Sequence, residues 1–203
     1  MCFPISPRPI FFFVLALTFT CQVAAAQDLH ASRRLSPIGI ARIHLGDTYV
    51  KVTYGRPYIR SREIFGADTD STTFLVPFGQ IWRTGASEAT EITVTGPVAI
   101  AENHLDAGTY SMYTEPGPDG WVFHLSPQLG LDGTGIFNAE TGVFTPDVYQ
   151  PDNDVAVFTV PANSLPEDEP IDQFTVSFEE TENGVDMVLR WEWTEVRAPI
   201  RAD

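Results

Sequence analysis

The segment FTVSFEETENGVDMVLRWEW, residues 174–193, carries the pattern that indicates the fold class. In its first part the apolar residues Phe174, Val176 and Phe178 alternate with polar ones. In its last part every second residue is again apolar, namely Met187, Leu189, Trp191 and Trp193. Successive side chains of a β-strand point to opposite faces of a sheet, so each part predicts a strand with one buried face. Asn183-Gly184 between them predicts a hairpin turn.

The same alternation recurs along the chain, while no long segment has the 3.6-residue apolar period of a helix. Further strands are expected at residues 38–45, 48–54, 92–95, 98–101, 109–114, 121–125 and 155–160. Gly46-Asp47 predicts a second hairpin turn. Nine or ten strands separated by Gly, Pro, Asn and Asp predict an all-β fold, either an antiparallel β-sandwich or a jelly-roll-like barrel.

Two long connections interrupt this pattern, residues 55–80 and 127–154. Connections of more than about 15 residues are uncommon in compact domains and often carry function. A shorter acidic loop is expected at residues 161–170. Since strands of the same character resume after each connection, residues 36–200 are expected to form a single β domain with two long loops.

The N-terminal residues 1–26 are expected to be a signal peptide. Arg8 is followed by an apolar run at residues 10–19 and by Ala24-Ala25-Ala26, which provides small residues for cleavage. The run is about half the ~20 residues that a membrane-spanning helix needs, so no membrane insertion is expected after cleavage. The protein is therefore expected to be exported, periplasmic or extracellular. Lipid attachment at Cys21 is the alternative, and residues 27–35 are expected to be a mobile leader.

Composition excludes several classes of function. The 203 residues include 27 acidic and 12 basic ones, for a net charge of −15, and such a surface repels nucleic acids and anionic lipid. Both cysteines, Cys2 and Cys21, lie within residues 1–26, so a mature chain would have no disulfide, no thiol nucleophile and no zinc–thiolate site. No cofactor is expected. The acidic excess is attributed to solubility, or to a saline habitat.

Several short motifs together resemble a known family. They are Ser36-Pro37, Tyr54-Gly55-Arg56-Pro57, Arg62-Glu63-Ile64-Phe65-Gly66, Leu75-Val76-Pro77-Phe78-Gly79, Trp82-Arg83-Thr84-Gly85-Ala86-Ser87-Glu88-Ala89-Thr90, Leu105-Asp106-Ala107-Gly108-Thr109-Tyr110-Ser111, Trp121, residues 174–178 and residues 189–192. In this order they resemble the secreted bacterial family catalogued as domain of unknown function twenty-nine-eleven. The resemblance covers about residues 36–200 and implies a secreted β domain without an assigned reaction. The chain departs from the family pattern at Ser61, at Ser87 and over residues 127–153.

The candidate ligand site consists of Arg56, Arg62, Arg83 and Glu88, with Tyr58 and Trp82 beside them. Arginine binds carboxylate, phosphate or sulfate through its planar fork, and an aromatic wall with a few charged groups is typical of a small-ligand pocket. A non-catalytic secreted binding or structural module, with a small anionic or sugar ligand, is the first hypothesis. Alternatively, Arg83 and Glu88 pair only to brace the loop against the sheet.

Two other classes of function stay open. A hydrolase or isomerase would use Glu88 with a second carboxyl group or a histidine, while the arginines hold an anionic substrate; no catalytic residue is assigned. His44, His104 and His124 are isolated, without metal-binding spacing. A calcium-stabilised adhesion domain would use Asp68-Thr69-Asp70 and Asp152-Asn153-Asp154, but no calcium-loop pattern is present, and no metal site is assigned. Trp191 and Trp193 are expected in the core rather than in a sugar platform.

Overall fold

The computed structural model describes residues 34–67, 73–138, 140–166 and 170–203. The expected signal peptide and most of the expected leader lie outside these residues. The strands are β1 (Ile38–Leu45), β2 (Thr48–Gly55), β3 (Glu63–Gly66), β4 (Phe74–Pro77), β5 (Thr90–Val94), β6 (Val98–Ile100), β7 (Asn103–Leu105), β8 (Gly108–Glu115), β9 (Gly120–Ser126), β10 (Ile136–Asn138), β11 (Val143–Thr145), β12 (Ala156–Ser164), β13 (Ile171–Thr181), β14 (Gly184–Glu192) and β15 (Thr194–Ala202). A 3-10 turn, η2, spans Pro151–Asn153. In the described parts of the chain no helix has the length and apolar character that crossing a bilayer requires.

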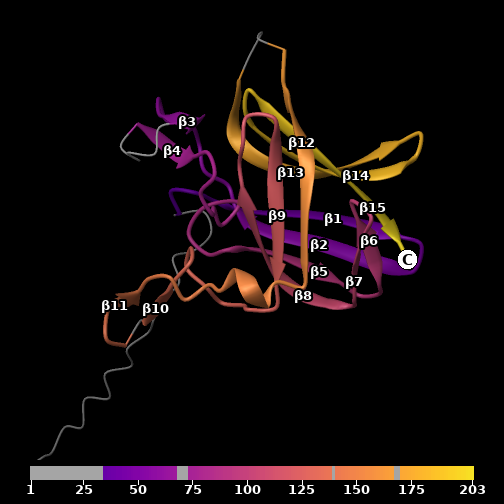
Figure 1. Cartoon of the computed structure of the whole chain (residues 1–203), viewed down its shortest axis with the longest axis horizontal. Helices are drawn as coiled ribbons and strands as arrows, with labels where there is room; N and C mark the ends of the chain where they lie inside the picture. Colours follow the sequence, from indigo (N-terminus) through magenta and orange to yellow (C-terminus); the bar gives the residue numbers. More distant parts are fainter. Residues whose placement is uncertain (1–33, 68–72, 139, 167–169) are drawn as a thin grey trace, which may run out of the picture.

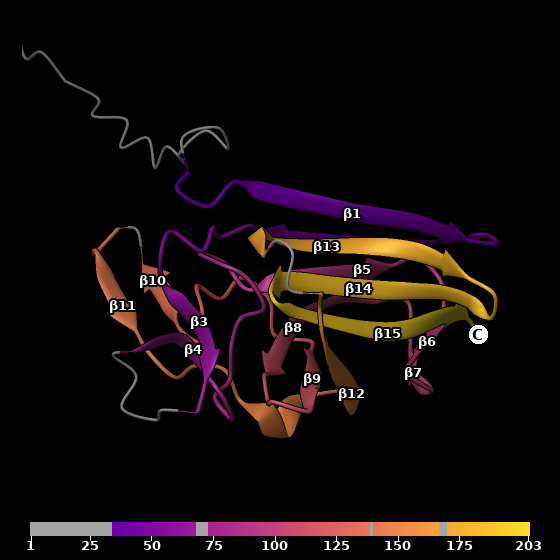
Figure 2. The same ribbon diagram turned by 90° about the horizontal axis from the view of Figure 1, so that it is seen from above.

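Eleven of the strands form one antiparallel sheet, which confirms the all-β antiparallel fold class. Its order is β1-β2-β5-β8-β9-β12-β15-β14-β13, and β6 pairs with both β15 and β7 (Figure 1). The sheet bends so that β13 comes to lie beside β1 (Figure 2). Among the described residues no backbone ladder joins these two end strands, so the sheet does not close into a barrel.

Strand β12 connects the two halves of the bent sheet. Its residues from Ala156 to Pro161 pair with β9, and its residues from Ala162 to Ser164 pair with β15. Proline has no N–H to donate, and Pro161 stands where β12 changes its partner. Residues 161–164 had been expected to begin a loop, and that expectation is wrong because they continue the strand.

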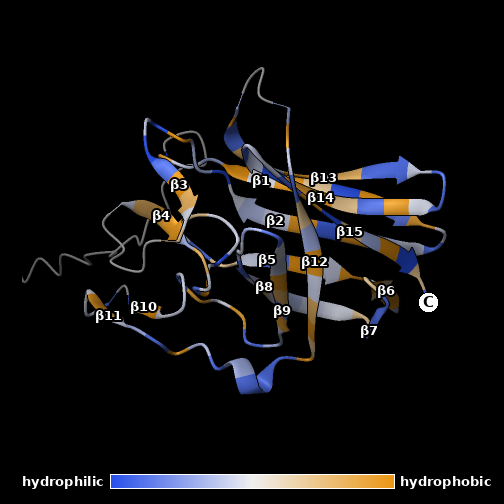
Figure 3. Cartoon of the chain, turned by 45° about the horizontal axis from the view of Figure 1, so that its top comes forward, coloured by the Kyte–Doolittle hydropathy of each residue, from blue (hydrophilic) through white to orange (hydrophobic). Residues whose placement is uncertain are grey.

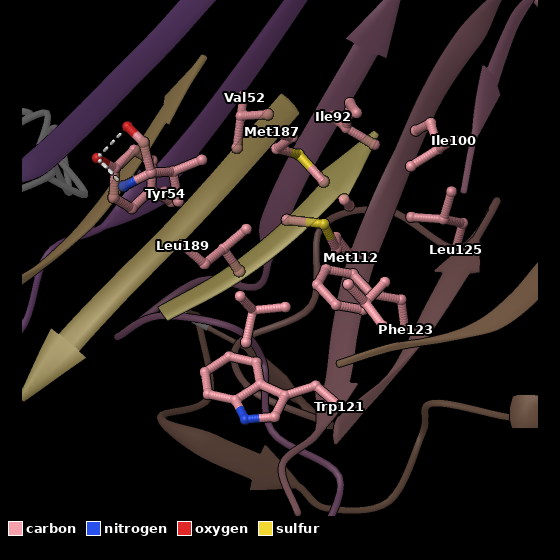
Figure 4. Close-up of a cluster of buried hydrophobic side chains, with 14 of the residues drawn as sticks. Val52, Tyr54, Ile92, Ile100, Met112, Trp121, Phe123, Leu125, Met187 and Leu189 are labelled. Carbon is pink, nitrogen blue, oxygen red and sulfur yellow. Dashed lines mark hydrogen bonds between the residues drawn. The ribbon is translucent and has the colours of Figure 1, made fainter. Parts of the chain in front are cut away.

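The inner faces of the two halves pack against each other and form the core. Side chains from β2, β5, β8 and β9 meet those of β14, as the buried Val52, Ile92, Met112, Phe123, Met187 and Leu189 show (Figure 4). At one end of this core an aromatic cluster contains Phe65, Trp82, Trp121, Phe174 and Trp191. Figure 3 shows that β13 becomes hydrophilic toward its hairpin end, where it extends beyond the core.

Both expected hairpins form, but one turn differs from its prediction. Leu45 pairs with Thr48 across Gly46-Asp47, as expected. In the second hairpin Thr181 pairs with Gly184, so the turn consists of Glu182-Asn183 rather than Asn183-Gly184.

The expected apolar stripe on β14 ends at Trp191. Glu192 has a positive φ of 53°, and Trp191 pairs directly with Thr194, so the chain reverses there. Trp193 lies in this turn and is 37% exposed, so its assignment to the core was wrong, whereas Trp191 is buried.

Each long connection contains small elements of its own. Residues 55–80 include the parallel pair β3–β4, and residues 127–154 include the hairpin β10–β11 and η2. Both two-stranded pieces lie at the same end of the large sheet, away from the β6–β7 hairpin (Figures 1 and 2). This end of the molecule holds the candidate site.

Candidate functional site

A hollow of about 230 Å³ lies at this end, and we call it the arginine hollow. Four of the six candidate residues line it: Tyr58, Arg62, Trp82 and Arg83. Arg60, which the sequence analysis did not single out, lines it as well, together with Leu35 and Leu75. The structure therefore brings three arginines and two aromatic residues to one concave surface.

The first wall of the arginine hollow is the segment that follows β2. It runs along the edge of β13, where Phe174 donates its backbone N–H to Pro57 and Ile59 donates to Asp172. The chain then reverses through Arg60 and Ser61, which have positive φ angles of 49° and 56°.

The side chain of Arg62 holds this reversal in place. Its Nε donates to the carbonyl oxygen of Ile59 at 3.0 Å and its Nη2 to that of Tyr58 at 2.6 Å. Arg62 thus stabilises the turn that presents Tyr58 and Arg60 to the hollow.

The opposite wall is the Trp82–Ala86 segment. Trp82 exchanges backbone hydrogen bonds with Thr114 of β8, and its indole N–H donates to the carbonyl oxygen of Gly85 at 3.0 Å. The segment then packs tightly on the end of β2, because a Cβ placed on Gly55 would lie 2.0 Å from the carbonyl oxygen of Ala86. This close packing fixes Arg83 relative to the sheet.

The guanidinium groups of the hollow have few anionic neighbours. Arg60 donates to the carbonyl oxygen of Leu35 at 2.6 Å and lies 5.8 Å from the ring centre of Tyr58. Arg83 donates to the carbonyl oxygen of Ser87 at 3.2 Å, and its nearest carboxylate, that of Asp132, is 3.9 Å away. Within the described ranges no carboxylate lies within ion-pair distance of Arg60 or Arg62.

Two candidate residues lie outside the arginine hollow. Arg56 donates to the carbonyl oxygen of Phe174 at 3.2 Å and to the hydroxyl of Thr175 at 2.9 Å, and so connects the segment after β2 to β13. Glu88 lines a different hollow, of about 190 Å³, together with Glu91.

The carboxylate of Glu88 pairs with Arg34 at 2.6 Å, and this hydrogen bond lowers the pKa of Glu88 from its usual value. Arg83 contacts Ser87 and Asp132, and does not form the pair with Glu88 that the brace alternative requires. A carboxyl group with a lowered pKa is ionised at neutral pH and is poorly suited to act as a general acid.

Another hollow, of about 280 Å³, adjoins the arginine hollow, and we call it the Phe144 hollow. Both hollows are lined by Leu75, Trp82 and Arg83, so they are neighbours on either side of these three residues. Asp132, Thr134 and Phe144 also line this hollow, together with Ile81 and Gly133. Phe144 belongs to β11, so the hairpin within the second long connection contributes to the site.

Of the residues considered for calcium, Asp68 and Asp70 lie outside the described residues, Asp152 is exposed, and Asp154 has other partners. The carboxylate of Asp154 accepts hydrogen bonds from Tyr149 at 2.6 Å and from Nδ1 of His124 at 2.9 Å. His124 therefore acts as a hydrogen-bond partner of Asp154, the residue that caps η2. Among the described residues no group of three or more His, Cys, Asp or Glu side chains is placed to hold a metal ion.

Sequence reasoning missed Arg60 and Phe144, for different reasons. A signal for Arg60 was available, because it lies between Tyr58 and Arg62 in a connection already considered functional. Phe144 gave no such signal, because it lies in the other long connection and lines the same hollow as Leu75 only in the folded chain.

Comparison of the chain with curated proteins and with solved structures gave no match. The model of one protein family matches residues 36–200, which include both walls of the arginine hollow and the β10–β11 hairpin. The fold and these residues therefore belong to the matched region, and the chain is a member of the family described as protein of unknown function (DUF2911).

Proposed function

We propose that the protein is an exported, non-catalytic binding module that holds a small anionic ligand in the arginine hollow. One observation carries the proposal: Arg60, Arg62 and Arg83 line a single hollow, and none of the described residues that line it carries a carboxylate. The chain has more than twice as many acidic as basic residues, so a hollow whose described charged residues are all arginines departs from the composition of the whole chain.

The other ion pairs of the molecule support this interpretation. Arg190 and Arg197 pair with Glu179, and Arg201 pairs with Glu102. In contrast, Arg60 and Arg62 contact backbone carbonyl oxygens, which leaves N–H groups of each guanidinium available to a ligand. A bound carboxylate, phosphate or sulfate would supply the missing negative charge through charge-assisted hydrogen bonds.

The size and walls of the hollow limit the ligand. Its volume of about 230 Å³ is below the ~300–1,000 Å³ of pockets for drug-sized molecules, so the anion is one small ring or a short chain. Tyr58, Leu75 and Trp82 provide apolar surface beside the cations, which suits a ligand with a carbon skeleton better than a bare inorganic ion.

The proposal is tested by isothermal titration calorimetry of the purified protein with citrate, galacturonate, phosphate and sulfate. We expect at least one organic acid to bind, and Arg60→Ala to weaken its binding at least tenfold, because a charged hydrogen bond contributes about 1.5–3 kcal/mol. Arg42→Ala is the matched control, because Arg42 is an exposed arginine on β1 that does not line the hollow. Binding of no anion, or an equal loss in the control, would contradict the proposal.

A further inference from the structure

We propose that the ligand is an acidic oligosaccharide of at least two sugar units, an inference that rests on the proposed function. One acidic sugar ring lies in the arginine hollow, and the adjoining ring lies in the Phe144 hollow. The two hollows together therefore form one elongated site that distinguishes a disaccharide from a single sugar acid.

The position of Arg83 makes the two hollows continuous. Arg83, Trp82 and Leu75 line both, so a ligand that leaves one hollow along these side chains enters the other. The Arg83 side chain is 38% exposed, and among the described residues it donates one hydrogen bond. A guanidinium with five N–H donors can therefore contact a ligand on both sides.

Two glycines in the loop before β10 allow the side chains of Arg83 and Phe144 to pack directly against the backbone. A Cβ on Gly133 would lie 2.7 Å from Nη1 of Arg83, and a Cβ on Gly135 would lie 2.4 Å from the Phe144 ring. Both side chains thus rest directly on glycine backbone of the loop before β10. Because larger residues at 133 and 135 would displace them, the loop supports the lining of the Phe144 hollow on both sides.

The groups that line the Phe144 hollow suit a ligand ring that carries many hydroxyl groups. The Asp132 carboxylate is 47% exposed and can accept hydrogen bonds from hydroxyl groups, while Thr134 supplies a further hydroxyl to the lining. The exposed ring of Phe144 offers an apolar face on which the C–H face of a sugar ring can pack. Carboxylate, hydroxyl and aromatic groups together match a sugar better than a purely apolar ligand.

An amino acid or peptide would fit the same two hollows less well. Its ammonium group would require a free carboxylate, but Asp132 lies 3.9 Å from the guanidinium of Arg83, which offsets its charge. A sugar hydroxyl is neutral and gains a hydrogen bond from Asp132 without competing with Arg83 for the charge. The structure therefore favours a polyhydroxylated acid.

The test compares galacturonate, digalacturonate and the neutral disaccharide cellobiose by calorimetry, with the dipeptide Glu-Lys as a zwitterionic probe. We expect digalacturonate to bind at least tenfold more tightly than galacturonate, and cellobiose and Glu-Lys more weakly than both. Phe144→Ala should lower the ratio of digalacturonate affinity to galacturonate affinity toward one. Val143→Ala is the matched control, because adjacent residues of β11 point to opposite faces and Val143 does not line the hollow.

The outcomes separate this inference from the proposed function. Equal affinities for galacturonate and digalacturonate, or the tightest binding by Glu-Lys, would overturn the oligosaccharide and leave an anion site in place. Binding of citrate or phosphate, with no binding of galacturonate or digalacturonate, would also overturn the oligosaccharide and leave an anion site in place. If cellobiose bound as tightly as digalacturonate and Arg60→Ala had no effect, both the oligosaccharide and the proposed function would be wrong.

Discussion

The hydroxyl of Tyr54 makes two hydrogen bonds to the backbone of Val176: it donates to the carbonyl oxygen at 3.1 Å and accepts from the N–H at 2.8 Å (Figure 4). Tyr54 belongs to β2 and Val176 to β13, which are not joined by a ladder. One side chain thus satisfies both backbone groups of a residue at the edge of the sheet, in a buried position. Burial also raises the pKa of the Tyr54 hydroxyl, which keeps it protonated and able to donate.

Tyr54→Phe should lower the free energy of unfolding by about 1–3 kcal/mol, because it leaves the buried N–H and carbonyl groups of Val176 without their partner. Urea denaturation followed by tryptophan fluorescence measures the change. Tyr49→Phe, on the same strand, removes a hydroxyl for which the structure shows no hydrogen bond among the described residues, and should have little effect. Equal stability of the two variants would refute this role of Tyr54.

Gly55→Ala should destabilise the protein by about 1–3 kcal/mol or more, since the new methyl group would lie 2.0 Å from the carbonyl oxygen of Ala86. Backbone rather than a flexible side chain blocks the methyl group, so the Trp82–Ala86 segment must shift. Gly120→Ala is a milder comparison, with a nearest neighbour at 3.1 Å. Thermal melting should rank Gly55→Ala as the less stable variant, and the reverse order would contradict the packing described.

Asp154→Asn should cost about 1–3 kcal/mol of stability, because the Asp154 side chain is only 1% exposed and is the acceptor for both His124 and Tyr149. The matched control is Asp152→Asn in the same turn, where the side chain is exposed. Chemical denaturation of both variants provides the measurement. The wild-type melting temperature should also stay unchanged in millimolar calcium, since Asp154 already has its partners.

Acid should weaken the ion-pair network on the outer face of β13–β15. The hydrogen bond from Arg190, followed by that from Arg197, lowers the pKa of Glu179 from 4.5 to about 2. Because the folded-state pKa lies below the unfolded one, the stabilisation is present above about pH 4.5 and is lost as the pH falls toward 2.

Denaturation between pH 2 and pH 6 tests this expectation. Glu179→Gln should be less stable than the wild type at pH 6, and the difference should shrink as the pH falls. Glu180→Gln removes the neighbouring carboxylate, for which the structure shows no ion pair among the described residues, and should track the wild type. A constant difference between Glu179→Gln and the wild type across this range would argue against the network.

Arg83→Ala should change the free energy of unfolding by less than about 1 kcal/mol. The Arg83 side chain is partly exposed and its carboxylate partner, Asp132, is 3.9 Å away, and such surface pairs contribute little. Ligand affinity should fall in the same variant, because Arg83 lines both hollows. A large loss of stability with unchanged binding would instead identify Arg83 as a structural brace.

Sequence patterns predicted most strands of the large sheet, because burial of one sheet face imposes a period of two, but they missed β7 and β15. They also brought Tyr58, Arg62, Trp82 and Arg83 into one candidate site, because the aromatic and basic residues are concentrated around the first long connection. They could not predict the reversal at Glu192, a residue type that carries no turn signal. The partner of Glu88 was also beyond reach, because Arg34 lies 54 positions away in the chain.

The change of pairing partner along β12 at Pro161 has a consequence for how the protein unfolds. Both halves of the sheet share β12, and each covers the apolar inner face of the other. Neither half of the sheet can unfold while the other half stays folded, because the folded half would then expose its apolar inner face to water. Thermal unfolding of the domain should therefore occur in a single cooperative step, with equal calorimetric and van't Hoff enthalpies.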